Sequence, residues 1–208
     1  MDRIGQGSLN EVTRCPHCSV AAPVLRLVWQ SENKIQRQDG GPQSRWAAYA
    51  CTRCGHVVLA KGNPAEPVAN PQIIEIIPEA RTAHEDVPQP ARRFLQQAFE
   101  TLHAPDAAAV MAGSAVDAML KEKGLRDGSL YTRIDQALAG NILTESMANW
   151  AHEVRLGSNR PRHADEQRPH VSEAEARQSV EFAEALGQFL FVLTARIERG
   201  IEAAQGAG

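Results

Sequence analysis

The sequence predicts a mainly α-helical protein that begins with a small β-structured ribbon held together by four cysteines. Two observations carry this fold class. All four cysteines fall in two C-x-x-C pairs near the N-terminus, and apolar residues recur at helical spacing after Pro90. Aromatic residues make up only 5% of the chain, which favours helices packed through leucine and alanine over a large β-sandwich core.

The cysteine pairs predict a structural zinc site. Cys15 and Cys18 form the first pair, Cys51 and Cys54 the second, and none is left for a disulfide or a nucleophile. A two-residue spacer lets one tight turn present both thiolates to a tetrahedral ion, and Gly55 suits the positive φ that such a turn often needs. Four thiolates leave no open position, so the expected Zn²⁺ is structural rather than catalytic. A redox dithiol is the competing interpretation, which a single pair would already satisfy.

The cysteine spacing and the prolines set the predicted domain limits. The ribbon is expected over residues 1–62, with β-rich runs at 24–30 and 45–50. Residues 63–90 contain six prolines, which exclude a continuous helix. Within this linker the run Ile73–Ile77 predicts a short strand, either at a sheet edge or in an extended arm between the two modules.

The helical bundle is predicted over residues 91–200, with a flexible tail at 201–208. Ser172 and Glu175 form a capping box at the start of the longest helix, and the small residues at 113–115 suit a close approach of two helices. The apolar stripes indicate burial against other helices, including those of a second copy of the chain. The five helices are expected at about 91–103, 105–124, 130–140, 143–157 and 172–199.

Charge is unevenly distributed along the chain. Residues 1–61 contain eight Lys/Arg and four Asp/Glu, a net charge of +4, whereas the whole chain carries −3. A basic module on an acidic body is expected where the module meets an anionic partner such as RNA or DNA, and a solvated surface is the alternative. The polar start of the chain and the absence of a long apolar run predict a cytoplasmic protein without a membrane partner.

The segment from Gly157 to Val171 is predicted to be a long loop that could carry chemistry. Arginines at a helix end can hold a phosphodiester, and a histidine there can act as general acid or base. Each residue also has a simpler explanation, since a cation stabilises a helix C-terminus and a histidine can anchor a loop. The residues expected to converge are Arg155, Asn159, Arg160, Arg162 and His163.

The stretch Trp150–His163 resembles a bacterial domain-of-unknown-function family, number forty-one forty-five, that is grouped with the HEPN-like helical bundles. The family signature is an Arg, a Gly-Asn turn and then a His, and here Ser158 separates Gly157 from Asn159. The N-terminal ribbon and the helix from Ser172 are also similar to that family. The resemblance implies a HEPN-like bundle, a homodimer and a role in bacterial defence. The Arg155-to-His163 spacing is longer than HEPN ribonucleases use.

Three functions follow as hypotheses. The first is a non-catalytic nucleic-acid-binding or partner-binding protein, in which Arg45 and Arg53 of the ribbon act with Arg160 and Arg162. The second is a metal-independent endoribonuclease of the HEPN type, with Arg155, Asn159 and His163 as its catalytic residues. The third is a structural adaptor that binds protein. Trp29, Trp46 and Tyr49 fit a ribbon core as well as a base-stacking platform.

Overall fold

The computed structural model describes residues 1–206 of the 208-residue chain. Its backbone contacts divide the chain into two compact units, Met1–Arg81 and the part from Thr82 onward. We call them the sheet unit and the helical unit. Among the residues described, no helix is both long and apolar enough to cross a membrane.

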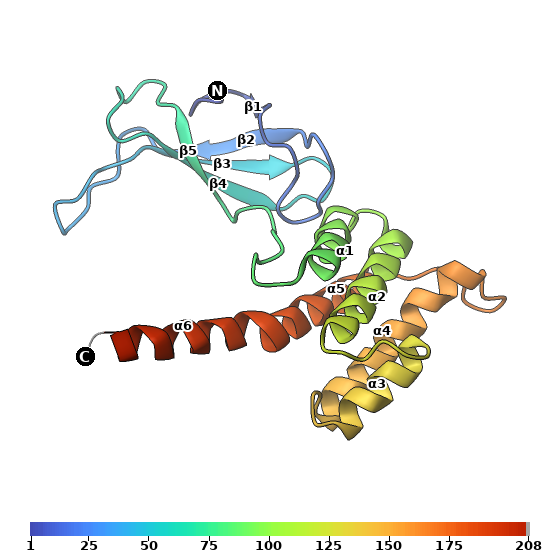
Figure 1. Cartoon of the computed structure of the whole chain (residues 1–208). Helices are drawn as coiled ribbons and strands as arrows, with labels where there is room; N and C mark the ends of the chain where they lie inside the picture. The colour runs from blue at the N-terminus through green and yellow to red at the C-terminus, as the bar shows by residue number, and fades with distance from the viewer. Residues whose placement is uncertain (207–208) are drawn as a thin grey trace. The chain divides into compact units, whose positions relative to one another are not determined.

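The sheet unit is built on five antiparallel strands that follow one another in chain order (Figure 1). Each strand pairs with the next one, and register irregularities fall between Leu27 and Trp29 of β2 and between Lys61 and Gly62 of β4. The strands are β1 Ser8–Leu9, β2 Leu25–Gln30, β3 Trp46–Cys51, β4 Val57–Gly62 and β5 Ile73–Ile77.

One face of this sheet forms a small apolar core. Tyr49 pairs with Leu27 on one side and Val58 on the other, and both Tyr49 and Val58 are fully buried. Side chains alternate between the two faces of a strand, so this row is followed on the same face by Cys51. The buried core comprises Ile4, Leu9, Cys15, Leu25, Ala47, Tyr49, Cys51, Val58 and Ala60.

The predicted fold class, a small zinc ribbon followed by a HEPN-like bundle, is wrong. The N-terminal part is a five-stranded sheet whose last strand, Ile73–Ile77, pairs with β4 and lies at the sheet edge. The sequence placed this run in a linker, as a short strand at a sheet edge or in an extended arm, and the first of these alternatives holds. Pro71 and Pro78 flank the strand rather than interrupt it, so proline does not prevent pairing. The N-terminus also contributes, since Ile4 and Leu9 are buried in the core.

The helical unit contains α1 to α6 and one π-helical segment, η1. The first three helices lie where the apolar spacing predicts them, and Ser129 caps α3 by accepting a hydrogen bond from the Thr132 N–H. Their bounds are α1 Gln89–Glu100, α2 Pro105–Glu122, α3 Leu130–Ala139, α4 Glu145–His163, α5 Glu173–Gly187, η1 Gln188–Val192 and α6 Leu193–Gly206.

Small residues let α2 and α4 approach closely. A Cβ added to Gly113 of α2 would lie 2.5 Å from the Ser158 Oγ and 2.7 Å from the Ser158 Cβ. The neighbouring positions on α2 are filled by buried alanines, including Ala109, Ala112 and Ala115. The small-residue face expected from the sequence is therefore the contact surface with α4, and a larger residue at 113 would force the two helices apart.

The C-terminal helix continues through α5, η1 and α6, as Figure 1 shows. Its capping box is confirmed, because the Ser172 side chain and the Glu175 side chain each accept a hydrogen bond from the other residue's N–H. The predicted apolar stripe is buried only in its first part: Leu186 is fully buried, whereas Leu193 and Ile197 are 48% and 54% exposed. Residues 201–206 of the predicted tail belong to α6, and 207–208 lie outside the described residues.

Candidate metal centre and candidate anion site

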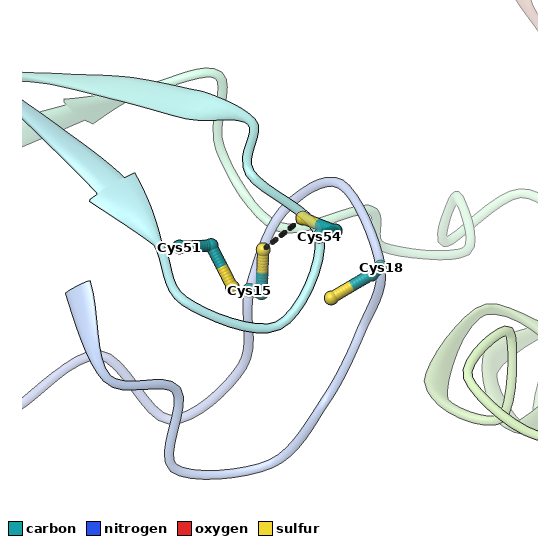
Figure 2. Close-up of side chains that lie close together, drawn as sticks. All are labelled: Cys15, Cys18, Cys51 and Cys54. Atoms are coloured by element: carbon teal, nitrogen blue, oxygen red, sulfur yellow. Dashed lines mark hydrogen bonds between the residues drawn. The ribbon is translucent and has the colours of Figure 1, made fainter.

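The four cysteines meet at one end of the sheet. Cys15 and Cys18 lie in the loop after β1, Cys51 ends β3, and Cys54 lies in the turn to β4. Their Sγ atoms all lie within 4.8 Å of one another (Figure 2). The Cys15 and Cys54 sulfurs are 3.9 Å apart, close to the edge of about 3.8 Å that four sulfurs at about 2.3 Å from one tetrahedral ion would define. This cluster can hold a metal ion.

The two cysteine turns have the same backbone geometry. In the first, the Ser19 N–H donates to the Cys15 carbonyl at 2.9 Å and the Cys15 N–H donates to the Val20 carbonyl at 3.1 Å. In the second, the corresponding bonds run from Gly55 to Cys51 at 2.8 Å and from Cys51 to His56 at 2.9 Å.

The residue after each pair is left-handed, with φ of 58° at Ser19 and 74° at Gly55. The positive φ expected at Gly55 is therefore present. The chain builds the same turn twice, and each turn aims two thiols at the same point.

Backbone N–H groups point at the sulfurs and favour their charged form. Burial raises the pKa of Cys15, although the N–H groups of Cys18 and His17 act against this. Burial also acts to raise the pKa of Cys51, but the N–H groups of Cys54 and Arg53 lower it overall. The pKa of Cys18 rises to about 12, chiefly through burial. A bound metal would compensate the charge of the Cys15 and Cys18 thiolates, whose pKa values burial raises.

Two histidines flank the cysteines without joining the cluster. His17 and His56 stack with their ring centres 4.9 Å apart, and His17 Nε2 lies 3.1 Å from the Val57 carbonyl. The group of atoms that could hold a metal ion consists of the four thiols. The stacked rings join the first cysteine turn to the second, which supports the positions of the ligands.

The first part of the predicted loop, from Gly157 to His163, is instead the last part of α4. Residues 164–171 lie outside any helix, as predicted. Ala164 ends the helix in a left-handed conformation, and its N–H donates to the Arg160 carbonyl. Gly157 and Ser158 are buried against α2 and α5, so tertiary packing keeps them helical despite the poor helix propensity of glycine. Pro161 lacks an N–H but is accommodated in this last turn.

Three predicted residues, Arg155, Asn159 and His163, therefore follow one another at four-residue intervals on α4. Residues four apart lie on one helix face. Arg155 and His163 are separated by eight residues, about 12 Å along the axis. Arg155 lines a cavity of about 410 Å³ and His163 lines a second one of about 430 Å³, and Asn159 contributes to both.

The first cavity, which we call the α2–α4 cavity, is lined mainly by cationic and hydroxyl side chains. Of its charged lining residues, only Asp117 is acidic. The Asp117 carboxylate lies 2.6 Å from the Lys121 amine and 2.7 Å from the Arg133 guanidinium. It therefore neutralises part of the charge of these two cations. The polar lining residues of the cavity are Ser114, Asp117, Lys121, Ser129, Tyr131, Arg133, Arg155, Asn159 and Arg162.

Arg155 and Arg162 have no carboxylate partner among the described residues. The Arg155 guanidinium lies over the Tyr131 ring, 5.2 Å from its centre. Its Nε is buried and makes no hydrogen bond within residues 1–206. Arg162 is exposed at the cavity rim. These two charges are therefore available to an anion that enters the cavity.

Arg133 has a structural role, although it lines the same cavity. It is 94% buried, and its guanidinium donates to the Asp117 carboxylate and to the carbonyls of Arg126, Asp127 and Gly128. These bonds fix the connection between α2 and α3. Sequence reasoning missed Lys121, Tyr131 and Arg133, because nothing in the local pattern indicates that α2 and α3 face Arg155.

The second cavity contains His163 with two arginines that share an acid. Arg160 and Arg168 each lie 2.8 Å from the same Glu175 oxygen. The Ser172 N–H, followed by Arg160 and the Ser172 hydroxyl, lowers the pKa of Glu175 to about 2. Arg160 is thus held by Glu175 of the α5 capping box. The residues predicted to converge in this segment therefore line two cavities instead of one.

The two arginines predicted in the ribbon differ in accessibility. Arg45 is buried and donates to the carbonyls of Ser31, Val68 and Ala69. Its guanidinium therefore holds the chain between β4 and β5. Arg53 lies exposed between the cysteines of the second pair, so only Arg53 of the two is free of such a structural contact.

The comparisons with known proteins give one positive result. The family model described as a domain of unknown function, DUF4145, matches residues 95–203. No curated protein and no solved structure matches the chain. The matched region runs from α1 into α6 and so contains the α2–α4 cavity and the whole of α4. Since it covers more than half of the chain, the protein belongs to the DUF4145 family.

Proposed function

We propose that this protein binds nucleic acid without cleaving it, and that the α2–α4 cavity holds its phosphates. The observation that carries the proposal is the pair of guanidinium groups, Arg155 and Arg162, that line the cavity without a carboxylate partner in the part of the chain described. A guanidinium offers a planar set of N–H donors that matches a phosphate. The Asn159 amide supplies a further donor beside them.

A chain of phosphates suits this surface better than a single anion. The second cavity, with Arg168 and His163, continues along α4 from the first through Asn159. Arg155 of the first cavity and His163 of the second lie about two helical turns apart, or about 12 Å along α4. A polyanion can occupy both, whereas a lone phosphate fills only one. Binding of this kind is expected to weaken steeply with salt.

Fluorescence anisotropy with a labelled short single-stranded RNA tests the proposal. Arg155→Gln and Arg162→Gln should each weaken binding by roughly threefold to tenfold and lower the slope of log affinity against log salt by about 1. The matched control is Arg177→Gln, because Arg177 is exposed on α5 and lines neither cavity. Absence of binding, or equal losses in all three variants, would contradict the proposal.

A second candidate function is a metal-independent ribonuclease. The placement of Arg155, Asn159 and His163 at four-residue intervals on α4 supports it. Because His163 lies about two turns from Arg155, a shared active site needs a group from elsewhere, such as a second copy. RNA cleavage in EDTA that is lost in His163→Ala would favour this candidate, and intact RNA with the wild-type protein would exclude it.

The metal in the sheet unit is proposed to be Zn²⁺. Four thiol ligands in two matching turns form a closed tetrahedral set of the kind that structural zinc prefers. Such an ion would stabilise the fold and offer no open position for substrate. Metal analysis of the purified protein tests the assignment, and a content well below one zinc per chain would contradict it.

A homodimer is the proposed assembly. An apolar stripe on η1 and α6 supports it, because Phe189, Leu193, Ile197 and Ile201 recur every four residues and are 44–54% exposed. Exposed apolar rows of this length are usually covered by a partner. A monomer at all concentrations in sedimentation equilibrium would exclude this assembly.

A further inference from the structure

The face of the sheet opposite to its core carries an unusual set of residues. The strand register places Trp29, Ala48, Leu59 and Ile77 side by side in one row across four strands. An adjacent row on the same face contains Trp46, Lys61 and Glu75. A third, on the other side of the first, contains Arg26, Ala50 and Val57. We call this surface the outer face.

The outer face is apolar but open. Trp29 is 52% exposed, and Val57, Leu59 and Ile77 are between 39% and 46% exposed. On the core face, by contrast, Tyr49 and Val58 are fully buried. Apolar side chains gathered on one exposed sheet surface commonly mark a binding site. The tertiary structure thus separates the aromatic residues of the sheet, with Tyr49 in the core and the two tryptophans on the outer face.

Small residues occupy the middle of this face, where Trp29 is exposed and Trp46 is half-buried. Ala48 and Ala50 lie on β3 between the larger side chains of β2 and β4. Trp29 is directly opposite Ala48, and Trp46 is two residues before Ala48 on β3. Residues in this diagonal relation lie about 7–8 Å apart. The two tryptophans therefore project from the same face at neighbouring diagonal positions, a spacing that successive unpaired bases can follow.

Cationic groups lie beside the rings. Lys61 Nζ is 5.7 Å from the centre of the Trp46 ring and 3.0 Å from a Glu75 oxygen. Arg26 projects from β2 on the same face and is exposed. The sheet unit as a whole has nine Lys/Arg and seven Asp/Glu, a net charge of +2. A surface with aromatic rings and cations side by side suits a ligand chain that carries both negative charges and flat apolar groups.

We propose that the outer face is a platform for single-stranded nucleic acid, in which unpaired bases stack on Trp29 and Trp46 while Arg26 and Lys61 attract the phosphates. This inference rests on the proposed function and names the form of nucleic acid that the protein prefers. Stacking needs an unpaired base, because the bases of a duplex already stack on one another and hide their faces. The α2–α4 cavity holds phosphates only and would not by itself distinguish a single strand from a duplex.

Tryptophan fluorescence of the full-length protein tests the proposal. Trp150, the remaining tryptophan, lies on α4 with its ring 5.0 Å from that of Phe182, so Trp150→Phe leaves only the two platform indoles as fluorophores. In this background, a short oligouridylate should quench the emission, whereas a duplex of equal length should not. Trp29→Ala should weaken oligouridylate binding on the order of tenfold, and Trp29→Tyr, which keeps an aromatic face, should restore most of it.

The outcomes separate this inference from the proposed function. If salt-dependent RNA binding persists but Trp29→Ala leaves it unchanged and duplex binds equally well, the platform is wrong and the proposed function stands. If neither form binds, both are wrong. Acrylamide quenching of the free protein adds a check, because indoles shielded from this small neutral molecule would mean that another surface already covers the outer face, which overturns the proposal. Val57→Ala, on the same face but without a ring, is the matched control and should bind oligouridylate almost as well as the parent.

Discussion

The two units reach stability by different means. The helical unit buries a large apolar core formed by α1 to α5 and η1, from Val87 to Val192. The core of the sheet unit is much smaller, and two of its buried members, Cys15 and Cys51, belong to the cysteine cluster. Small cores seldom stabilise a fold without a cross-link or a metal. This difference implies that loss of a bound metal should unfold the sheet unit and leave the helical unit folded.

The largest expected effect is therefore that of metal removal. Chelation, or Cys54→Ser, should unfold the sheet unit, because structural zinc contributes roughly 10–16 kcal/mol in model fingers. The near-ultraviolet circular dichroism of Trp29 and Trp46 should collapse, while the helical signal at 222 nm changes little. Thr52→Ala, between the two ligands of the second pair, is the control and should retain metal. A chelated protein with unchanged spectra would show that the metal is dispensable.

A smaller effect is expected from Gly113→Ala in the helical unit. The added Cβ meets Ser158 at 2.5 Å, so the variant should lose about 1–3 kcal/mol of unfolding free energy through overpacking. Urea unfolding followed at 222 nm measures this loss. Ser158→Gly removes the side chain that the new Cβ meets, so the double variant should recover most of the stability. Equal losses in the single and double variants would refute the close contact.

The smallest effect concerns the capping box of α5. Glu175→Gln should cost about 1 kcal/mol at neutral pH, since it weakens a helix cap. The pKa of Glu175 is lowered to about 2 from an ordinary value of 4.5. Its contribution is therefore present above pH 4.5 and lost as the pH falls towards 2.

The Glu175→Gln variant should therefore lose part of the pH dependence of the unfolding free energy between about pH 4.5 and pH 2. Glu173→Gln, in the same first turn, forms no such box and is the control. Parallel pH profiles for the wild type and Glu175→Gln would contradict the assignment.

Local features of the fold follow closely from the sequence. The capping box at Ser172, the turn at Gly55 and the helices α1 to α3 depend on short-range geometry, which residue type and spacing specify. The cysteine spacing likewise indicated which four thiols would meet. The strand at Ile73–Ile77 was recognised as a β-structure, but its pairing with β4 was not, because pairing depends on residues distant in the sequence.

The candidate site shows the same limit. Gly157 and Pro161 read as the start of a loop by propensity, yet the packing of Ser158 against Gly113 keeps this segment helical. Arg155 therefore lies inside α4, and its neighbours Lys121 and Tyr131 come from α2 and α3. The net charge of +4 over residues 1–61 also falls to +2 once the sheet unit is taken to Arg81.

The sequence by itself determined the two cysteine turns, the helical spacing and the caps, because each arises within a few residues of backbone whose geometry is locally constrained. Only the tertiary structure decided that Tyr49 is buried while Trp29 is exposed, that Arg45 is enclosed by carbonyls while Arg162 is accessible, and that Arg155 and His163 line separate cavities. Whether a side chain is buried, and which groups it contacts, depends on surfaces brought together from distant segments. No local sequence pattern can specify these properties.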